Sequence, residues 1–485
     1  MADVCTIIIE DECNIKLSGL DLATRKACNK AVEYFLPGAR YSSAYKLGRW
    51  NGMQSFCNMG GRTYLNLLDK FLPIIQDAGY EIEIDDHREL HDFKFDPIDE
   101  KFLSHLTWPA GHRAEGQPIM MRDYQVKIVN DCINNLQGLS IASTSAGKTL
   151  CTVSLSMMAQ KYGRSIVIVP NINLVQQTEE DFRNVGLDVG VLYGNRKEYD
   201  RTHTICTWQS LSVLDKKSKD CLDDDQLAVF MDGLVAVIVD EAHGVKDLNV
   251  LHTMLTTTFA HIPIRWGLTG TLPEEDFKQM GLISAVGPVV GVVTAKELQD
   301  AGYIANCDIT MLQTQETAKH GNYQEELKYL VTNEKRLEWL ANQVTDIAKN
   351  GNTVVLVDRI PTGRALEAML PGSIFISGDM KADKRREHYK EINLDDNKIL
   401  IATYGCLSTG ISINRIFNLV LVEAGKSFTR VIQSIGRGLR KADDKDSVNV
   451  FDVSSSCKYS KKHMLKRKEF YKSAQYPFKL EKVHY

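Results

Sequence analysis

Two kinds of apolar spacing divide the chain. In the first part, short apolar runs at 5–9 and 80–84 predict strands, whereas a 3.6-residue spacing of apolar positions over 21–35 and 64–78 predicts helices. This mixture indicates a small α+β accessory domain over residues 1–105, which ends in an acidic linker.

Beyond this domain the chain alternates strongly apolar runs with helical segments. Such runs are typical of strands buried on both faces, and their alternation with helices predicts parallel sheets. The runs are too many for one sheet. The expected fold class is therefore α/β, with two tandem doubly wound lobes at 106–300 and 301–455 and a basic tail at 456–485. The strongest runs are 166–169, 234–239, 354–357, 374–376, 398–402 and 419–422.

A phosphate-binding loop is predicted at 142–149. The segment reads Ala-Ser-Thr-Ser-Ala-Gly-Lys-Thr, which is a P-loop with Ala in place of the first Gly. Small residues let backbone N–H groups approach phosphates, and the following helix points its positive end at them. We expect the lysine to reach the β- and γ-phosphates of ATP and the threonine hydroxyl to bind Mg²⁺. The residues assigned to this site are Ser145, Ala146, Gly147, Lys148 and Thr149.

A second acidic centre follows the apolar run at 234–239. The run ends in Asp240-Glu241-Ala242-His243, and an Asp at the carboxyl edge of a parallel strand lies where α/β sheets bind ligands. We expect Asp240 to hold Mg²⁺, mainly through its water shell, and Glu241 to orient and deprotonate the attacking water. The P-loop and this centre together predict hydrolysis of ATP.

Both motifs belong to a longer series that resembles the superfamily 2 helicases. The resemblance covers about residues 120–442, with every motif in family order, and it implies two RecA-like lobes that clamp ATP between them. The matching segments are 121–125 (Q motif), 142–149 (motif I), 168–175 (Ia), 207–211 (Ic), 240–243 (II), 267–272 (III), 353–359 (IV), 402–412 (V) and 433–440 (VI).

Within the superfamily, the sequence is most similar to phage UvsW-type recombination and branch-migration helicases. The similarity rests on Leu47-Gly-Arg-Trp-Asn-Gly52 and Leu68-Asp-Lys-Phe in the first domain, and on the amino-acid sequences of motifs I and V. Many superfamily members carry Asp at the Ser412 position, where it helps to bind ribose, but UvsW-like proteins also carry Ser. The resemblance implies an ATP-dependent DNA helicase or translocase that unwinds or branch-migrates forked and junction DNA in replication, recombination or repair.

Motif VI would supply the second half of the catalytic set. The resemblance implies that Gln433, Arg437 and Arg440 join Lys148 and Glu241 when the lobes close. An arginine finger of this kind stabilises charge in the transition state and can be worth about 10³–10⁵ in rate. Because the two arginines lie three residues apart, one helix face is expected to direct both toward ATP.

The resemblance also assigns binding residues outside the catalytic set. His243 is expected to couple motif II to the second lobe, while Trp208 in motif Ic either stacks on a base or is buried. Sequence-independent DNA contacts would come from backbone amides and hydroxyls of motifs Ia, Ic, IV and V. The nucleotide-binding residues are Arg122, Gln125, Gly410 and Ser412; the DNA-binding residues are Pro170, Asn171, Thr207, Gln209, Arg359 and Thr403.

A formal net charge of −4 hides three strongly charged segments. Residues 16–62 carry a net charge of +6, and they interleave basic with aromatic residues, which predicts contact with duplex DNA through Lys46 and Arg49. Residues 81–100 carry −7 and form the acidic linker, whereas 458–485 carry +7. That basic tail also holds Phe470, Tyr471, Tyr476 and Phe478, so it either binds phosphates or packs against the second lobe.

The rest of the composition bounds the setting. The 11 cysteines are scattered without a CxxC pair, which favours structural thiols over a metal site. The basic n-region of a signal peptide is absent from the sequence, and so is any apolar run of 18 residues. We expect a cytoplasmic monomer, in the host cytoplasm if phage-encoded, that binds single-stranded, forked and branched DNA and no membrane. Single-strand-binding or recombination proteins are candidate partners.

Three other functions compete with this interpretation. An RNA helicase would share the motor motifs, although the large C-terminal extensions of DEAH RNA helicases do not occur in this sequence. The motor of a restriction nuclease is the second, because Asp99-Glu-Lys101 matches the last fragment of a nuclease motif. A clamp that binds ATP without hydrolysing it is the third, and the complete set of Glu241, Gln433, Arg437 and Arg440 argues against it.

Overall fold

The computed structural model describes residues 3–110, 112, 114–220, 226–245, 249–380, 382–407, 413–440, 442 and 444–485. The chain divides into two compact units, one of residues 1–141 and 149–292 and the other of 142–148 and 293–485. The first unit contains two sheets that matter for function, that of the N-terminal domain and that of lobe 1. The second unit contains the sheet of lobe 2.

The N-terminal domain is built on a four-stranded sheet in the order β5-β2-β1-β6. β1 pairs antiparallel with β2 and parallel with β6. Alternate residues of β1 and β2, such as Ile7, Ile15 and Leu17, are buried on the face that the helices cover. The elements are β1 (Val4–Ile9), β2 (Asn14–Ser18), α1 (Leu22–Ala31), β5 (Arg62–Tyr64), the 3-10 helix η2 (Leu65–Lys70), α3 (Leu72–Asp77) and β6 (Glu81–Asp86).

The helices predicted at 21–35 and 64–78 are only partly correct. The first ends at Ala31, because the next residues form β3 (Glu33–Phe35), which pairs with β4 (Met53–Ser55). The β-branched and aromatic residues Val32, Tyr34 and Phe35 favour this extended pairing over helix. The second segment splits into β5, η2 and α3, with Pro73 at the start of α3. A strand at 14–18 was not predicted.

The N-terminal domain packs directly on lobe 1. Tyr34 stacks on Phe277 of α10 (Asp276–Val286), with ring centroids 4.8 Å apart, and Met280 and Ile283 of the same helix join the domain's core. Backbone contacts reinforce the packing, since the amide of Glu12 donates to the carbonyl of Ala260 at 3.1 Å. One side of α10 therefore packs against the core of the N-terminal domain, while lobe 1 keeps a core of its own.

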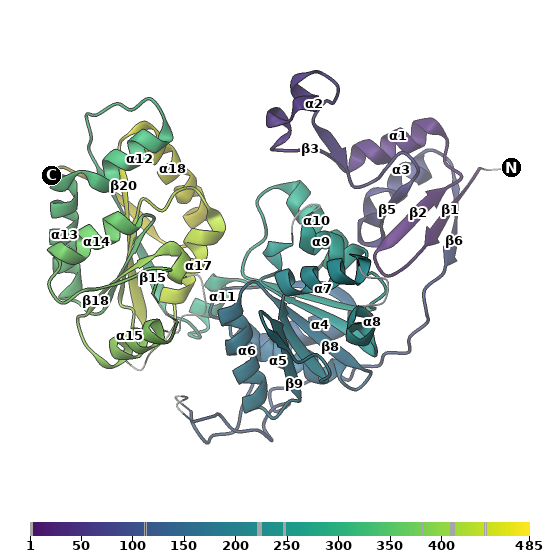
Figure 1. Ribbon diagram of the computed structural model, residues 1–485, viewed down its shortest axis with the longest axis horizontal. Coiled ribbons are helices and arrows are strands. Elements are labelled where there is room, and N and C mark those ends of the chain that lie inside the picture. Colours follow the sequence, from purple (N-terminus) through teal and green to yellow (C-terminus); the bar gives the residue numbers. More distant parts are fainter. Residues whose placement is uncertain are drawn as a thin grey trace. The chain divides into compact units, whose positions relative to one another are not determined.

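Lobe 1 is an eight-stranded sheet with helices on both faces. In Figure 1, α5 and α6 lie on one face and α7 and α9 on the other. In spatial order the strands are β10 (Arg196–Lys197), β9 (Val189–Tyr193), β11 (His203–Thr207), β8 (Arg164–Val169), β12 (Leu234–Asp240), β13 (Ile264–Thr269), β7 (Gln137–Ala142) and β14 (Val289–Val293). The helices include α4 (Asp123–Ile133), α5 (Lys148–Ala159), α6 (Ile172–Asn184), α7 (Trp208–Asp220), α8 (Gln226–Met231) and α9 (Val250–Thr256).

Lobe 2 is a seven-stranded parallel sheet that α13 and α14 cover on one face and α17 and α18 on the other (Figure 1). Its strands in spatial order are β17 (Ile374–Ile376), β18 (Ile399–Thr403), β16 (Thr353–Val357), β19 (Asn418–Val422), β20 (Ser447–Ser455), β15 (Asn306–Thr314) and β21 (Phe478–Val483). Its helices are α11 (Ala295–Asp300), α12 (Tyr323–Thr332), α13 (Glu334–Ala348), α14 (Ile360–Met369), α15 (Ala382–Leu394), α16 (Tyr404–Leu407), α17 (Phe428–Gly438) and α18 (Lys458–Ser473).

The segment predicted as a basic tail is part of lobe 2. β21 pairs in parallel with β15 at the edge of the sheet. Phe470, Tyr471 and Tyr476 are buried, at 3%, 0% and 3% exposure. Of the two interpretations of this segment, the aromatics thus pack against the lobe, while α18 and β21 complete its fold.

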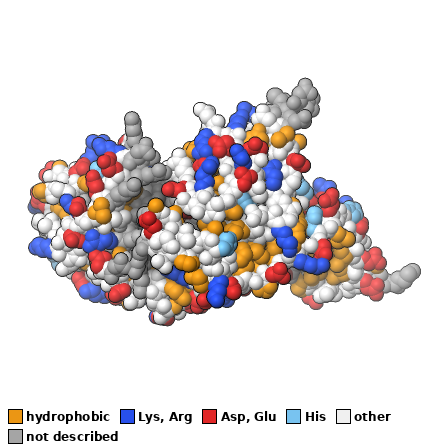
Figure 2. Space-filling view, turned by 90° about the horizontal axis from the view of Figure 1, so that it is seen from below, with side chains coloured by type: hydrophobic (Ala, Val, Ile, Leu, Met, Phe, Trp, Pro, Cys, Tyr) orange, Lys and Arg blue, Asp and Glu red, His pale blue; other side chains and the backbone are white. Residues whose placement is uncertain are grey.

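Two further features concern the chemistry of the whole chain. The ten cysteines among the described residues are buried free thiols, and Cys221 lies outside that set. None of the described helices combines the length and the apolar character that crossing a membrane requires. On the face that Figure 2 draws, basic and acidic side chains are interspersed over both units.

Candidate ATP and DNA sites

The P-loop connects β7 to α5 in a tight turn. Ser145 and Gly147 adopt left-handed backbone conformations, with φ of 75° and 71°, so the loop curls around the space before the helix. Lys148 is the first residue of α5, and its Nζ donates to the carbonyl of Ala142 at 3.4 Å. The loop thus has the curvature and the helix N-terminus that phosphate binding requires.

Motif II lies where the buried strand β12 ends. Asp240 is its last residue, and one of its carboxylate oxygens accepts a hydrogen bond from the amide of Glu241 at 2.9 Å. Glu241 itself has φ of 50° and ψ of 48°, a left-handed conformation that is rare for a residue with a side chain. Backbone strain of this kind concentrates at functional sites, so this conformation is consistent with a catalytic role for Glu241.

His243 joins motif II to motif III. Its Nδ1 lies 3.1 Å from the Thr269 hydroxyl and 3.3 Å from the Glu241 carboxylate. Thr269 in turn donates to the carbonyl of Thr271 at 3.0 Å. Sequence analysis missed this link, since nothing in the spacing of 243 and 269 indicates that β12 and β13 are neighbours.

Strand register brings these motifs to one edge of the sheet. β13 lies between β12 and β7, with Leu268 opposite Asp240 and Thr269 opposite Ile141. The P-loop leaves β7 one residue after Ile141. Parallel strands therefore present the acidic centre, motif III and the start of the P-loop at the same carboxyl edge, where α/β sheets bind ligands.

The Q motif forms the start of α4. The Gln125 side chain is 5% exposed, and its carbonyl oxygen accepts from the amide of Arg122 at 3.0 Å. Arg122 also donates to the Tyr124 hydroxyl at 2.9 Å. Met121 contacts Ser154 of α5 with a sulfur-to-hydroxyl distance of 3.6 Å, so the Q motif packs against the P-loop helix.

The predicted DNA contacts of lobe 1 also share an edge. Thr207 ends β11 opposite Val169, the last residue of β8, and Pro170 and Asn171 follow directly. Asn171 caps α6 by accepting from the amide of Leu174 at 3.1 Å, and Thr207 is buried at 4% exposure. Gln209 is exposed on α7, whereas Trp208 is half-buried against the lobe core. Burial is thus the better of the two interpretations of Trp208.

The predicted DNA contacts of lobe 2 are neighbours as well. Thr403 ends β18 opposite Val357, the last residue of β16, and Arg359 follows two residues later. Arg359 is exposed and donates to the side-chain carbonyl of Gln324 at 3.0 Å. Both residues stand at the carboxyl edge of the sheet. Gly410 and Ser412 of motif V lie outside the described residues.

Motif VI differs from the expectation in one respect. Gln433 and Arg437 belong to α17, but the helix ends at Gly438, so Arg440 does not share a helix face with Arg437. Lys445 explains the ending. Its ammonium, 2% exposed, donates to the carbonyls of Gly438, Arg440 and Asn414, the last two at 2.8 and 3.2 Å. A cation at the helix C-terminus stabilises carbonyls that the helix leaves unpaired.

Lys46 and Arg49 lie together on an excursion of the N-terminal domain. The excursion connects β3 to β4 and carries the 3-10 helix η1 (Ala39–Tyr41) and α2 (Ser43–Lys46). Lys46 and Arg49 are both exposed, and Tyr41 is 82% exposed. Trp50 instead faces inward, donating its indole N–H to the carbonyl of Met53 at 2.8 Å.

The donor chemistry fits Mg²⁺. Asp240 and Thr149 would offer one carboxylate and one hydroxyl, which are hard oxygen ligands of the kind that Mg²⁺ prefers alongside water and phosphate oxygens. Among the described residues, no cluster of three or more His, Cys, Asp or Glu side chains could hold a metal ion by itself.

Comparison with known families agrees with the motif order. The model "Type III restriction enzyme, res subunit" matches residues 118–274, and "Helicase conserved C-terminal domain" matches residues 335–442. These two ranges correspond to the motif-bearing parts of lobe 1 and lobe 2.

Similar proteins extend the sequence similarity beyond the two motor lobes to the N-terminal domain. The ATP-dependent DNA helicase uvsW of Enterobacteria phage T4 is 24% identical over 459 residues, which cover 89% of this chain and 87% of that protein. The DNA 3'-5' translocase XPB2 of Sulfurisphaera tokodaii is 25% identical over 312 residues, covering 63% and 64%. A fragment assigned to the HsdR subunit of a type I restriction enzyme from Vibrio vulnificus shares the fold, with a TM-score of 0.57, 17% identity, and coverage of 97% and 85%.

Proposed function

The chain is a superfamily 2 DNA helicase of the UvsW-like kind that hydrolyses ATP, and from this premise we propose that it remodels forked and branched DNA. The observation that carries the proposal is the register of β12, β13 and β7, which gathers motif II, motif III and the P-loop at one sheet edge. That arrangement supports a motor in which motif III adjoins the site of ATP hydrolysis.

Within the proposed cycle, each residue has one task. Lys148 neutralises phosphate charge, and Glu241 takes a proton from the attacking water. Mg²⁺, held through Asp240 and Thr149, would neutralise charge that develops between the β- and γ-phosphates. Gln433, Arg437 and Arg440 stabilise the transition state when they reach the nucleotide. His243, through Thr269, passes a change at Glu241 on to motif III.

DNA would be held without regard to sequence. Asn171, Thr207 and Gln209 on lobe 1, and Arg359 and Thr403 on lobe 2, supply amides, hydroxyls and a guanidinium at strand ends. Lys46 and Arg49 would hold duplex DNA. Both are exposed on the excursion between β3 and β4, which also carries the highly exposed Tyr41. The protein would act as a monomer, alongside single-strand-binding or recombination proteins.

Two substitutions test the ATP site. Lys148→Ala should abolish both ATP binding and hydrolysis, whereas Glu241→Gln should keep binding but lower turnover by about 10²–10⁴-fold. Glu338→Gln, on exposed surface of α13, is the matched control and should retain normal turnover. The measurements are DNA-stimulated phosphate release and binding of a fluorescent ATP analogue. Near-normal turnover in Glu241→Gln would show that another group is the base.

Arg440 tests the role of motif VI. Arg440→Ala should leave ATP affinity within about tenfold while lowering turnover by about 10²-fold or more, because the guanidinium acts on transition-state charge. Weakened ATP binding at unchanged turnover would instead make it a ground-state ligand.

A restriction-type motor is the second candidate function, because restriction enzymes are among the proteins that share the fold. Asp99 and Lys101 lie in an exposed stretch of turns before lobe 1. Mg²⁺-dependent cleavage of plasmid would favour this function, and competition between fork DNA and RNA addresses the RNA alternative.

A further inference from the structure

The helix α18 has two unlike faces. The inward face is set by Ser460, Met464, Arg467 and Tyr471, which recur with helical spacing and are all buried. On the outward face lysine is the commonest residue, and this face also exposes Leu465 at 48%. Its exposed residues include Lys458, Lys461, Lys462, Lys466 and Lys472, against a single exposed carboxylate, Glu469, which pairs with Lys466 at 3.1 Å.

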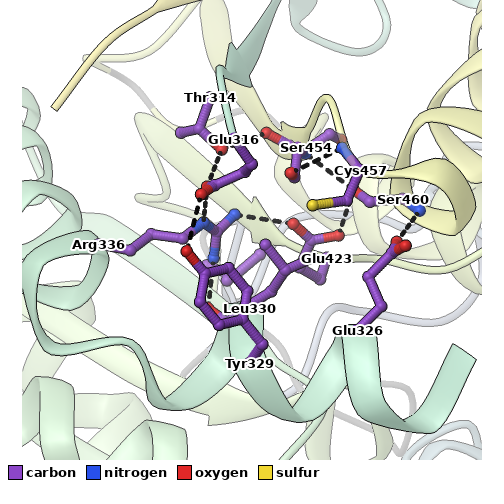
Figure 3. Close-up of polar contacts among 12 residues, drawn as sticks. Thr314, Glu316, Glu326, Tyr329, Leu330, Arg336, Glu423, Ser454, Cys457 and Ser460 are labelled. Atoms are coloured by element: carbon purple, nitrogen blue, oxygen red, sulfur yellow. Dashed lines mark hydrogen bonds and ion pairs between the residues drawn. The ribbon is translucent and has the colours of Figure 1, made fainter. Parts of the chain in front are cut away.

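Buried polar contacts hold the first turn of α18 in place (Figure 3). The Glu326 carboxylate accepts from the amides of Tyr459 and Ser460 at 3.0 and 2.6 Å, which satisfies donors at the helix N-terminus. The Ser460 hydroxyl donates to Glu423 at 2.7 Å, and Arg336 donates to the same carboxylate at 2.7 Å. The lysines of the first turns are therefore presented from a rigid base.

The first turn lies at the same sheet edge as the predicted DNA contacts of lobe 2. β16, β19 and β20 run parallel side by side, so their carboxyl ends share one edge. Arg359 follows β16, and Lys458 follows β20, two strands away. At about 4.8 Å between neighbouring strands, β16 and β20 lie about 10 Å apart along this edge. Long side chains can close such a gap to successive phosphates.

The N-terminal end of α12 bridges the two places. Gln324 accepts from Arg359, and its neighbour Tyr323 contacts Tyr459 and His463 of α18 edge-on, with ring centroids 6.1 and 5.1 Å apart. The surface between Arg359 and α18 is thus continuous and contains two half-exposed tyrosines.

Positive charge dominates this surface. Burial lowers the pKa of His463, and the nearby cations Arg467, Lys426 and Lys462 lower it further, against the opposing effect of Glu326. The exposed acids close by are Glu325, whose carboxylate accepts from the Gly321 amide and the Asn322 side chain at the start of α12, and Asp358, which lies 3.8 Å from Arg359. Lys458 and Lys462 stand one helical turn apart, a like-charge pair that destabilises an isolated helix and that a polyanion would relieve.

We propose that Lys458 and Lys462 bind DNA phosphates and extend the grip of lobe 2 from Arg359 across the N-terminal end of α18. The inference rests on the proposed function in so far as Arg359 is itself a DNA contact. The ligand is the DNA backbone and not its bases, because lysines carry point charges without base-reading geometry.

The test compares two double variants of the full chain with equal loss of charge. Lys458→Ala with Lys462→Ala removes the proposed contact, while Lys349→Ala with Lys398→Ala removes two exposed lysines that follow α13 and precede β18, at the opposite edge of the same sheet. The probe is fluorescein-labelled forked DNA, titrated at several salt concentrations. Thermal unfolding establishes that both variants keep the wild-type midpoint.

The first double variant should weaken DNA binding by about tenfold and reduce the slope of log affinity against log salt by nearly 2, whereas the control keeps both at wild-type values. The DNA concentration for half-maximal ATPase stimulation should rise, with the rate at saturating DNA retained. An unchanged affinity and salt slope would overturn the proposal. Arg359→Ala distinguishes this inference from the proposed function. If DNA binding is unchanged in Arg359→Ala but lost in the double variant, α18 contacts DNA and Arg359 of motif IV does not.

Discussion

The two ends of the chain add basic segments to the motor by different means. At the N-terminal end, residues 4–86 form a sheet of their own and reach lobe 1 through surface contacts, among them Tyr34 against Phe277 and the backbone bond from Glu12 to Ala260. At the C-terminal end, β21 enters the sheet of lobe 2 and α18 covers it. The first is a domain docked on a lobe, and the second is a piece of the lobe.

This difference matters for how each end can move and be removed. A docked domain can lose its contacts while both partners keep their own cores, which here comprise separate sheets. A strand and helix built into a sheet cannot leave without exposing buried charge, in this case Asp452. We therefore expect substitutions at the C-terminal end to affect folding and those at the N-terminal end to affect docking.

The largest expected effect is at Arg467. Its guanidinium holds the buried Asp452 carboxylate with two hydrogen bonds of 2.8 Å. Arg467→Ala would leave that carboxylate buried without its cation, and should destabilise the protein by about 3–5 kcal/mol. Urea unfolding measures the loss, and exposed Lys466→Ala should stay within about 0.5 kcal/mol. A loss below about 1 kcal/mol would mean that α18 is not integral to lobe 2.

The docked domain should loosen in acid through His252. This residue is fully buried in α9, edge-on to Tyr64 at 5.5 Å, and burial, aided by Arg265, lowers its pKa to about 4. Unfolded chains protonate histidine near pH 6.5, so this stability is present above that pH and is lost as pH falls toward 4, up to about 3 kcal/mol.

Hydrogen exchange of β5 and η2 between pH 7 and pH 4.5 measures this loosening. His252→Gln should flatten the pH dependence. His203 of lobe 1 also has its pKa lowered to about 4 by burial, and it is retained in both proteins, so the difference between them isolates His252. An identical pH profile in the variant would assign the acid response to lobe 1.

Removing the stacking residue should weaken docking by less. Phe277→Ala deletes a half-buried ring and should cost about 2 kcal/mol, below the range for fully buried phenylalanine. Phe277→Tyr keeps the ring and should retain docking. Limited proteolysis of the acidic linker reports the change. Phe93 and Phe95 of the linker contact Tyr162 of lobe 1, and a loosened domain should release the linker for cleavage. Equal cleavage of wild type and Phe277→Ala would show that Phe277 does not hold the domain on lobe 1.

The smallest effect concerns the basic excursion of the N-terminal domain. Lys46→Ala with Arg49→Ala should leave stability within about 0.5 kcal/mol, since both side chains are exposed. Binding to forks and four-way junctions should weaken with a shallower salt dependence, while binding to single-stranded DNA is retained. Fluorescence titration over the three DNAs measures this. Equal losses of affinity for all three DNAs would show that the N-terminal domain does not recognise junctions.

Sequence reasoning succeeded where short motifs carry chemistry. The strand runs at 234–239 and 419–422 and the loop around Lys148 are local, so spacing alone predicts them. It failed where tertiary context decides. The strand at 14–18 is short and polar on its outer face, and Arg467 lies at a core position of α18 that only its 3.6-residue spacing with Ser460, Met464 and Tyr471 could have indicated.

The polar network of lobe 2 could not have been predicted. Arg336 and Glu326 come from two helices and Glu423 from the loop after β19, and each residue type is ordinarily exposed. Lys445 was missed for the same reason, although it sets where α17 ends and so where Arg440 lies. The expectation that Arg437 and Arg440 share a helix face was wrong because helical continuation was assumed through Gly438.

The place of β21 in the sheet also governs the order of folding during synthesis. β15, the first strand of lobe 2 to be made, lies between β20 and β21, and its start at Asn306 and the end of β21 at Val483 are about 180 residues apart. At about 5–20 residues per second, a ribosome needs roughly 10–35 s to supply both neighbours. Lobe 1 and the N-terminal domain have all their strands by then. β7, the strand that leads into the P-loop, therefore has both of its sheet neighbours, β13 and β14, before β15 has both of its own.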